Sequence, residues 1–173
     1  MKTGKTSSYR ILVVLSVVAF MLLGTLVALA AEGACYYCGM KQAMFEHSWV
    51  QIEREDGTTV GVCSVHCAAV DMALNIDKPA KSITVGDYNT KKQIDAEKAY
   101  WVIGGSKMGV MTSRAKWAFE SKDGADAFMK ENGGRPAIFE EVMKATFEDM
   151  YEDTLMIQKK RKMKRMKKGS GHS

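Results

Sequence analysis

Four cysteines and one nearby methionine are the residues of this chain whose types and spacing could carry chemistry. The cysteines form two pairs, Cys35-Tyr-Tyr-Cys38 and Cys63-Ser-Val-His-Cys67, and no other cysteine occurs among the 173 residues. Met40 follows the first pair by two residues. Sulfur ligands select Cu(I), Zn(II) or iron–sulfur chemistry over hard cations. The pattern therefore predicts a sulfur-based site.

Four interpretations of the cysteines are open at this point. Four thiolates around one ion would make a closed tetrahedral zinc site. A thioether is a poor ligand for Zn(II) and a good one for Cu(I), so Met40 favours copper. Cys35 and Cys38 alone could form a thiol–disulfide centre, although such a pair usually lies at a helix start in a thioredoxin-like context. Two structural disulfides would suit an oxidising compartment, but the short spacings are more typical of metal ligands and redox pairs.

Histidines and further methionines extend the list of candidate ligands. His66 lies between Cys63 and Cys67 and is expected on a different helix face, so His47 is the better candidate. Most of the 13 methionines are expected to be ordinary core filler. Four methionines differ because they are expected in loops or next to glycine: Met40, Met44, Met108 and Met111.

Residues 1–31 have the pattern of an export segment. Three basic residues precede an uncharged run from position 11 to 31, and Ala28-Leu29-Ala30 fits the rule for signal-peptide cleavage. The run is also long enough to span a bilayer as an uncleaved anchor, although the flanks favour cleavage. A lipoprotein fits less well, because the residues before Cys35 lack the leucine of a lipobox. We therefore predict a periplasmic or otherwise extracytoplasmic, membrane-associated domain.

The positive charge of the chain is concentrated at its ends. The formal net charge is +5, but residues 159–168 hold eight Lys/Arg and the first ten residues hold three. Without these eleven, 14 Lys/Arg face 20 Asp/Glu, so residues 31–158 carry −6. An acidic body is not expected to bind nucleic acid. The basic tail is expected either to bind anionic lipid or to remain a solvated arm for an acidic partner.

Local patterns predict an α+β domain. Alternating residues around Asp56-Gly57 predict a hairpin over 48–62, and residues 63–75 form an apolar helical face with Ser64 as N-cap. Two further strands are expected at 82–87 and 99–103. Helices are expected at 123–132, ended by two glycines, and at 138–158, continuing into the basic tail.

These elements suggest two small strand–strand–helix units followed by a C-terminal helix. In the first unit, one cysteine pair precedes the hairpin and the other begins the helix, as in treble-clef metal modules. We divide the chain into residues 1–31 as signal or anchor, 32–145 as the metal-binding domain, and 146–173 as helix and basic tail. No acid–base pair or nucleophilic triad is recognisable, so an enzyme is not expected.

Several short segments, in this order, resemble the NosL family of exported copper-binding accessory proteins, over residues 35–143. The segments are Cys35-Tyr-Tyr-Cys38-Gly39-Met40, Ser48-Trp49-Val50, Asp56-Gly57, Cys63-Ser-Val-His-Cys67-Ala68, Val85-Gly-Asp87-Tyr88, Ala99-Tyr-Trp-Val-Ile-Gly104, Met108-Gly109-Val110-Met111, and Ala127-Phe128 before Gly133-Gly134.

The resemblance implies a Cu(I) chaperone that delivers copper to a periplasmic cuproenzyme such as nitrous oxide reductase, or to its assembly machinery. It implies two ββαβ units, with Cys38, Met40 and Met108 as copper ligands. The second cysteine pair is consistent with the related TRASH-like metal modules, and the remaining cysteines would complete the site or exchange ligands with the recipient. The chain departs from the family pattern in its defective lipobox, its full set of four cysteines and its basic tail.

Overall fold

The structure is a computed structural model that describes residues 33–169. The predicted export segment, residues 1–31, lies outside the described residues. Within them, no helix is long and apolar enough to cross a bilayer.

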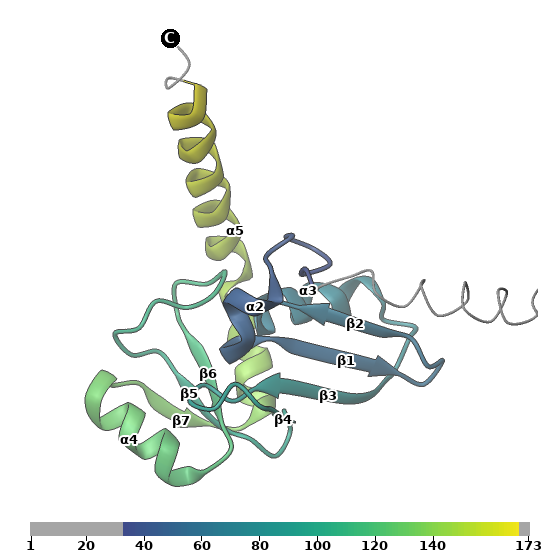
Figure 1. The fold of residues 1–173 in the computed structure, drawn as a ribbon, viewed down its shortest axis with the longest axis vertical. Coiled ribbons are helices and arrows are strands. Elements are labelled where there is room, and N and C mark those ends of the chain that lie inside the picture. The colour runs from purple at the N-terminus through teal and green to yellow at the C-terminus, as the bar shows by residue number, and fades with distance from the viewer. Residues whose placement is uncertain (1–32, 170–173) are drawn as a thin grey trace, which may run out of the picture. The chain divides into compact units, whose positions relative to one another are not determined.

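The first half of the domain is a ββαβ unit (Figure 1). Its elements are β1 (Val50–Arg54), β2 (Thr59–Val62), α3 (Val65–Leu74) and β3 (Ala80–Gly86). A short edge strand, β4 (Gln93–Asp95), completes an antiparallel sheet of order β2-β1-β3-β4. The predicted hairpin is confirmed, because β1 pairs with β2 around Gly57, whose φ of 81° only glycine adopts readily.

The second half repeats this topology. It comprises β5 (Tyr100–Ile103), β6 (Lys116–Phe119), α4 (Lys122–Asn132) and β7 (Arg135–Ala137). The antiparallel order β6-β5-β7 matches β2-β1-β3, with the first strand of each unit at the centre. The prediction of an α+β fold with two ββαβ-like units is therefore confirmed. The two strands predicted at 82–87 and 99–103 lie in different sheets, and three further strands, β4, β6 and β7, were not predicted from the sequence.

A buried carboxylate joins the two units. Asp87, directly after β3, is 2% exposed and accepts backbone N–H groups from Asn89 at 3.0 Å, Thr90 at 2.6 Å and Glu120 at 2.7 Å. The backbone N–H of Tyr88 also donates to the carbonyl oxygen of Ala118 in β6 at 2.8 Å. These bonds fix the end of the first sheet against the second.

The C-terminal helix α5 (Phe139–Gly169) packs against α3 and β5 with its first half, and its second half extends away from the sheets (Figure 1). Val142, Thr146 and Asp153 on this helix are fully buried. The helix continues 11 residues beyond the predicted end at 158, so residues 159–169 of the basic tail are helical. The first half of α5 therefore covers α3, the helix that carries Cys67.

Candidate metal site

The fold brings the four cysteines together. Their Sγ atoms all lie within 4.8 Å of one another. The Sγ of Cys63 is 3.4 Å from that of Cys38 and 3.7 Å from that of Cys67. All four are free thiols. Cys35, Cys63 and Cys67 are buried, and Cys38 is half-buried.

The first pair lies in a tight loop stabilised by its own backbone. The N–H of Cys35 donates to the carbonyl oxygen of Met40, and the N–H of Gly39 donates to that of Cys35, both at 2.8 Å. Gly39 has a φ of 74°, so the turn needs glycine at this position. The loop is attached to the hairpin by a bond from the N–H of Tyr36 to the carbonyl oxygen of Gly61 at 3.2 Å. These bonds define the turn that presents Cys35 to the interior and Cys38 to its edge.

The second pair is positioned by the end of β2 and the first turn of α3. Cys63 directly follows β2, and its carbonyl oxygen accepts a 2.8 Å hydrogen bond from the hydroxyl of Ser48. Ser64 occupies the predicted N-cap position, but its hydroxyl makes no capping hydrogen bond. Cys67 lies in the first helical turn, where free backbone N–H groups and the helix dipole favour a thiolate.

A buried polar network fixes the cysteine loop to α3. The Tyr37 hydroxyl donates to Oδ1 of Asp71 at 2.6 Å, and the other oxygen of Asp71 is ion-paired with Arg54 of β1. The carboxylate raises the pKa of Tyr37 to about 12, after the larger contribution of burial. The network joins three elements that carry or flank the thiols, so it supports the geometry of the cluster.

The crowding of the four thiols separates their pKa values. Hydrogen bonds from Cys38, Cys63 and Cys67 hold the pKa of Cys35 well below the usual range. Hydrogen bonding to Cys35 raises the pKa of Cys38, but contacts with Cys63 and Cys67 outweigh it and lower the value to about 7. The pKa values of Cys63 and Cys67 are raised, chiefly by hydrogen bonds from Cys35 and Cys38. Cys38, whose pKa is lowered, is therefore the thiol on the accessible side of the cluster.

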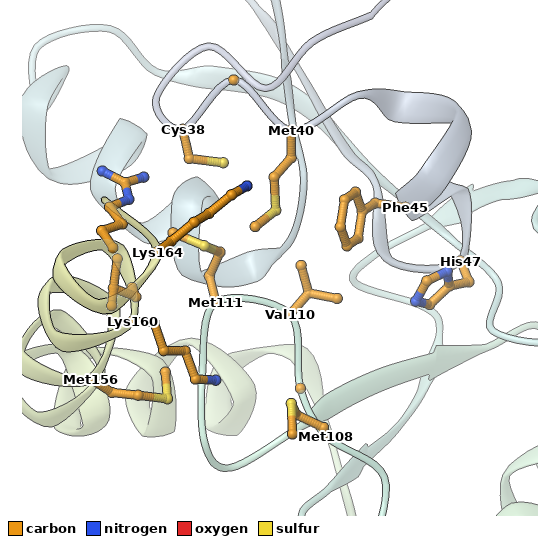
Figure 2. Close-up of a pocket in the computed structure, with 14 residues that line it drawn as sticks. Cys38, Met40, Phe45, His47, Met108, Val110, Met111, Met156, Lys160 and Lys164 are labelled. Atoms are coloured by element: carbon orange, nitrogen blue, oxygen red, sulfur yellow. The ribbon is translucent and has the colours of Figure 1, made fainter. Parts of the chain in front are cut away.

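A pocket of about 700 Å³ opens beside Cys38 (Figure 2). Methionines from three parts of the chain line it, namely Met40, Met108, Met111 and Met156. In Figure 2, Cys38, Met40 and Met111 surround one end of the pocket, whereas Met108 lies at the opposite end beyond Val110. Thioethers and one thiol thus converge on an open cavity.

The backbone of Met111 is in a conformation that side chains rarely adopt. Its φ is 62°, and a residue other than glycine or asparagine in this region costs about 1 kcal/mol. Met111 is partly buried and packs against the core cluster that contains the cysteines. Strain of this kind is typical of positions where a side chain is held for function.

Helix α5 holds the loop that carries Met108 and Met111. The Ser113 N–H donates to Oδ1 of Asp153 at 2.9 Å, and the Ser113 hydroxyl lies 3.2 Å from Sδ of Met156. Arg114 makes a bidentate pair with Asp149 at 2.7 and 2.8 Å. The helix also contributes three cations to the pocket lining: Lys160, Arg161 and Lys164.

The remaining sequence-predicted residues fall into two groups. His47 lines the pocket and packs on Trp117, with ring centroids 5.5 Å apart; burial, and then the charge of Lys91, lower its pKa below 6.5. Met108 also lines the pocket but is 75% exposed. Met44 is exposed on the short helix α2 (Gln42–Phe45), which precedes a 3-10 turn, η2 (Glu46–Ser48), and it is not among the lining residues.

His66 faces α5 rather than the pocket lining. Its Nδ1 is 3.4 Å from Oδ2 of Asp153, and both side chains are buried. This position agrees with the expectation that His66 lies on a different face of the helix from Cys63 and Cys67.

Sequence reasoning missed Met156 and the three cations of α5. No sequence pattern distinguishes them, because methionine and basic residues are both common on a long charged helix.

The arrangement is suited to holding a soft metal ion rather than to disulfide exchange. Cys35 is buried and lies in a loop before a four-residue helix, whereas a redox pair presents an accessible thiolate at the start of a longer one. Four converging thiols can bind one ion, and the neighbouring thioethers favour Cu(I). These features define a small α+β protein of two ββαβ units with a cysteine cluster compatible with metal binding.

Comparison with known proteins identifies the family. The NosL family model matches residues 26–147, and the chain belongs to the NosL family. The fold is similar to the crystal structure of the copper chaperone NosL from Shewanella denitrificans, with a TM-score of 0.52 and 22% identity over 66% of this chain and 92% of that chain.

The solution structure of apo-NosL from Achromobacter cycloclastes is 27% identical over 52% of this chain and 81% of that chain, with a TM-score of 0.36. No curated protein matches the chain in sequence.

Proposed function

We propose that this protein is an exported Cu(I) chaperone that binds copper in the methionine-lined pocket and delivers it to a periplasmic cuproenzyme such as nitrous oxide reductase. The family membership supports this role, because a similar solved structure is that of a copper chaperone. The observation that carries the proposal is the convergence of Met40 and Met111 with Cys38 at one end of an open pocket.

The ligand types favour Cu(I) over other ions. Thioethers are soft ligands, suited to Cu(I), and they stay uncharged at every pH. Met40 and Met111 are partly buried and packed against the core, so their positions are defined before metal arrives. We assign Met111 rather than Met108 as the downstream thioether, because Met108 is largely exposed and lies at the other end of the pocket.

An open, low-coordinate site suits delivery. A ligand from the recipient can add to the bound ion before a ligand of the chaperone leaves, so copper is never released into solution. The openness of the pocket beside half-buried Cys38 provides the access that such an exchange needs. The role is that of a carrier, and no reaction on a substrate is proposed.

The residues at the two ends of the chain support the proposed location and partners. Residues 1–31 would direct the protein out of the cytoplasm and, if retained, hold it at the membrane. The basic helical segment 159–169 would strengthen membrane contact through anionic lipid or would dock on an acidic recipient. Nucleic acid is not proposed as a partner.

The test is Cu(I) affinity under anaerobic, reducing conditions, measured by competition with a calibrated chelator. Replacing Met40 or Met111 with Leu keeps the volume and apolar character while removing the sulfur, and each change should weaken Cu(I) binding roughly tenfold or more, about 1.4 kcal/mol. Met44→Leu is the matched control, because Met44 is exposed and close in sequence but is not a lining residue. Equal affinities for all variants would refute the proposed site.

A further inference from the structure

We propose that a second pocket, next to the methionine-lined one, binds an organic carboxylate. The cavity has a volume of about 480 Å³. Three aromatic rings, two lysines, an asparagine and a methionine line it: His47, Tyr88, Trp117, Lys91, Lys107, Asn89 and Met108. The inference goes beyond the proposed function, because it requires neither copper nor the cysteine cluster.

The second pocket adjoins the methionine pocket at the end that is remote from the thiols. His47 and Met108 line both cavities, and Figure 2 shows both residues away from Cys38. The proposed copper site uses neither of them, although both are candidate ligands by residue type. A ligand in the second pocket would therefore lie beside the bound metal without occupying its site.

The lining of the second pocket is positively charged. Lys91 and Lys107 are exposed, and neither side chain has an ion-pair partner within residues 33–169. No Asp or Glu lines the cavity, although residues 31–158 carry a net charge of −6, from 14 Lys/Arg against 20 Asp/Glu. The charge of Lys91 also reaches His47, whose pKa it lowers after the larger effect of burial. Such a lining attracts an anion.

The walls of the pocket are aromatic, which favours an organic acid over an inorganic anion. The ring centroid of Trp117 is 5.0 Å from that of Tyr88 and 5.5 Å from that of His47. The rings of His47 and Tyr88 are perpendicular at 6.0 Å. A planar apolar group attached to the carboxylate would pack against these rings, as aromatic pairs do.

One buried donor at the pocket has no acceptor. The indole N–H of Trp117 is buried and makes no hydrogen bond within the part of the chain that the structure describes. The indole N–H of Trp101, by contrast, donates to the carbonyl oxygen of Ala96 at 2.8 Å. Leaving a buried donor unpaired is unfavourable, so each such group calls for an explanation. Because Trp117 lines the pocket, an acceptor bound there would satisfy this N–H.

The loop that carries Lys91 is fixed before any ligand binds. Within residues 33–169, two residues other than glycine have a positive φ, namely Met111 in the methionine pocket and Lys91, at 65°, in this one. The N–H of Lys91 donates to the carbonyl oxygen of Asp87 at 2.9 Å, and the Asp87 carboxylate accepts the N–H groups of Asn89 and Thr90. Strained backbone of this kind is typical of positions that hold a side chain for binding.

The test titrates the full chain, kept reduced and free of copper, with benzoate, and with benzamide as the uncharged analogue. The three tryptophans give three indole N–H signals in NMR spectra, and Trp117→Phe identifies the signal of Trp117. We expect benzoate to shift this signal saturably, with an affinity that falls as salt is added. Benzamide should bind at least about tenfold more weakly, and the signal of Trp101 should not move. Absence of a saturable shift with benzoate would overturn the inference.

Variants locate the bound anion. Lys91→Gln and Lys107→Gln should each weaken benzoate binding about threefold or more, because each removes one cation of the lining. Lys92→Gln is the matched control, since Lys92 is the exposed neighbour of Lys91 and does not line the pocket. An equal loss in Lys92→Gln would show a general effect of surface charge and overturn the inference. Weakening by Lys164→Gln, with Lys91→Gln silent, would place the anion in the methionine pocket and also overturn it.

Two sources of the carboxylate are distinguished once benzoate binding is shown. A peptide with two aspartates flanking a phenylalanine, blocked at both ends, represents an acidic segment of a recipient protein. Binding at least about tenfold tighter than benzoate, by engaging both lysines at once, assigns the site to such a segment, and any smaller gain assigns it to a free organic acid. Failure to bind Cu(I), with benzoate binding intact, would refute the proposed function alone, and the reverse outcome would refute this inference alone.

Discussion

Replacing Asp149 with Asn should destabilise the protein and weaken copper binding, because it breaks the contact that fixes the methionine loop to α5. The carboxylate of Asp149 accepts a 2.6 Å hydrogen bond from Nζ of Lys116 and a bidentate pair from Arg114. The side chain of Lys116 is 0% exposed, and its ammonium group also donates to the hydroxyl of Thr112 at 3.4 Å. The substitution therefore leaves a fully buried ammonium group without a counter-charge.

The magnitude follows from that burial. Removing one partner of a buried ion pair typically costs about 3–5 kcal/mol. Asparagine can still accept one hydrogen bond, and Arg114 is 40% exposed and can be solvated, so we expect about 3 kcal/mol here. For a domain of this size such a loss lowers the melting temperature by about 10 °C. Cu(I) affinity should fall as well, since the loop bearing Met111 loses its attachment.

The pH dependence of the unfolding free energy provides a second test of the role of Asp149. Burial by itself raises the pKa of Asp149, but hydrogen bonds from Arg114 and Lys116 hold it below its ordinary 3.8. The stabilisation is therefore complete above pH 3.8 and is lost as the pH falls through the lower, folded-state value. The difference in unfolding free energy between the unmodified chain and Asp149→Asn should narrow in that acidic window.

Urea unfolding at pH 7 measures the effect, and two variants control for it. Glu148→Gln alters an exposed contact to the same Arg114, at 3.3 Å, and should cost less than about 1 kcal/mol. Lys116→Met combined with Asp149→Leu should recover most of the loss, because neither charge remains buried. A cost for Asp149→Asn no larger than that of Glu148→Gln would refute the reasoning.

Three further predictions concern the helix, the tail and the cysteine loop. Met156→Leu should weaken Cu(I) binding several-fold, whereas Met163→Leu, on the same helix but not among the pocket-lining residues, should leave the chelator competition unchanged. In a chain that lacks residues 1–31, deleting residues 159–173 should abolish binding to vesicles containing anionic lipid, and binding that survives the deletion would exclude the lipid role. Tyr37→Phe should cost about 1–2 kcal/mol in urea unfolding, because Asp71 loses its 2.6 Å hydrogen bond; no measurable cost would mean that water replaces the hydroxyl.

Elements with strong local signals were predicted correctly from the sequence. The hairpin around Gly57 and the helices near 65–74 and 122–132 each combine a period of two or 3.6 residues with a turn or cap, and the structure confirms them. The missed strands lack such signals. β6 is four residues buried on both faces, so it shows no alternation, and β7 is a three-residue edge strand that contains Pro136.

The cysteine cluster and the methionine pocket differ in how far the sequence can predict them. Both cysteine pairs lie in one ββαβ unit, where local elements alone bring them close. Met111 and Met156 reach the pocket only through the packing of the second unit and of α5, over more than 70 residues of chain from Met40. Nothing in the local pattern distinguishes these two from core filler.

The acidic middle of α5 shows why such assignments need tertiary structure. On a helix rich in Asp and Glu, carboxylates are expected to form a solvated face, yet Asp153 is fully buried and Asp149 is mostly so. Asp153 accepts a hydrogen bond from the N–H of Ser113, and Asp149 forms ion pairs with Arg114 and Lys116. All three partners lie within five residues of Met111. The same helix supplies Met156 and the cations that line the pocket beside Cys38. The charges of α5 alone indicate a solvent-exposed helix, yet this helix organises the loop that would hold the metal. Its buried carboxylates therefore link the stability of the domain to the geometry of the pocket.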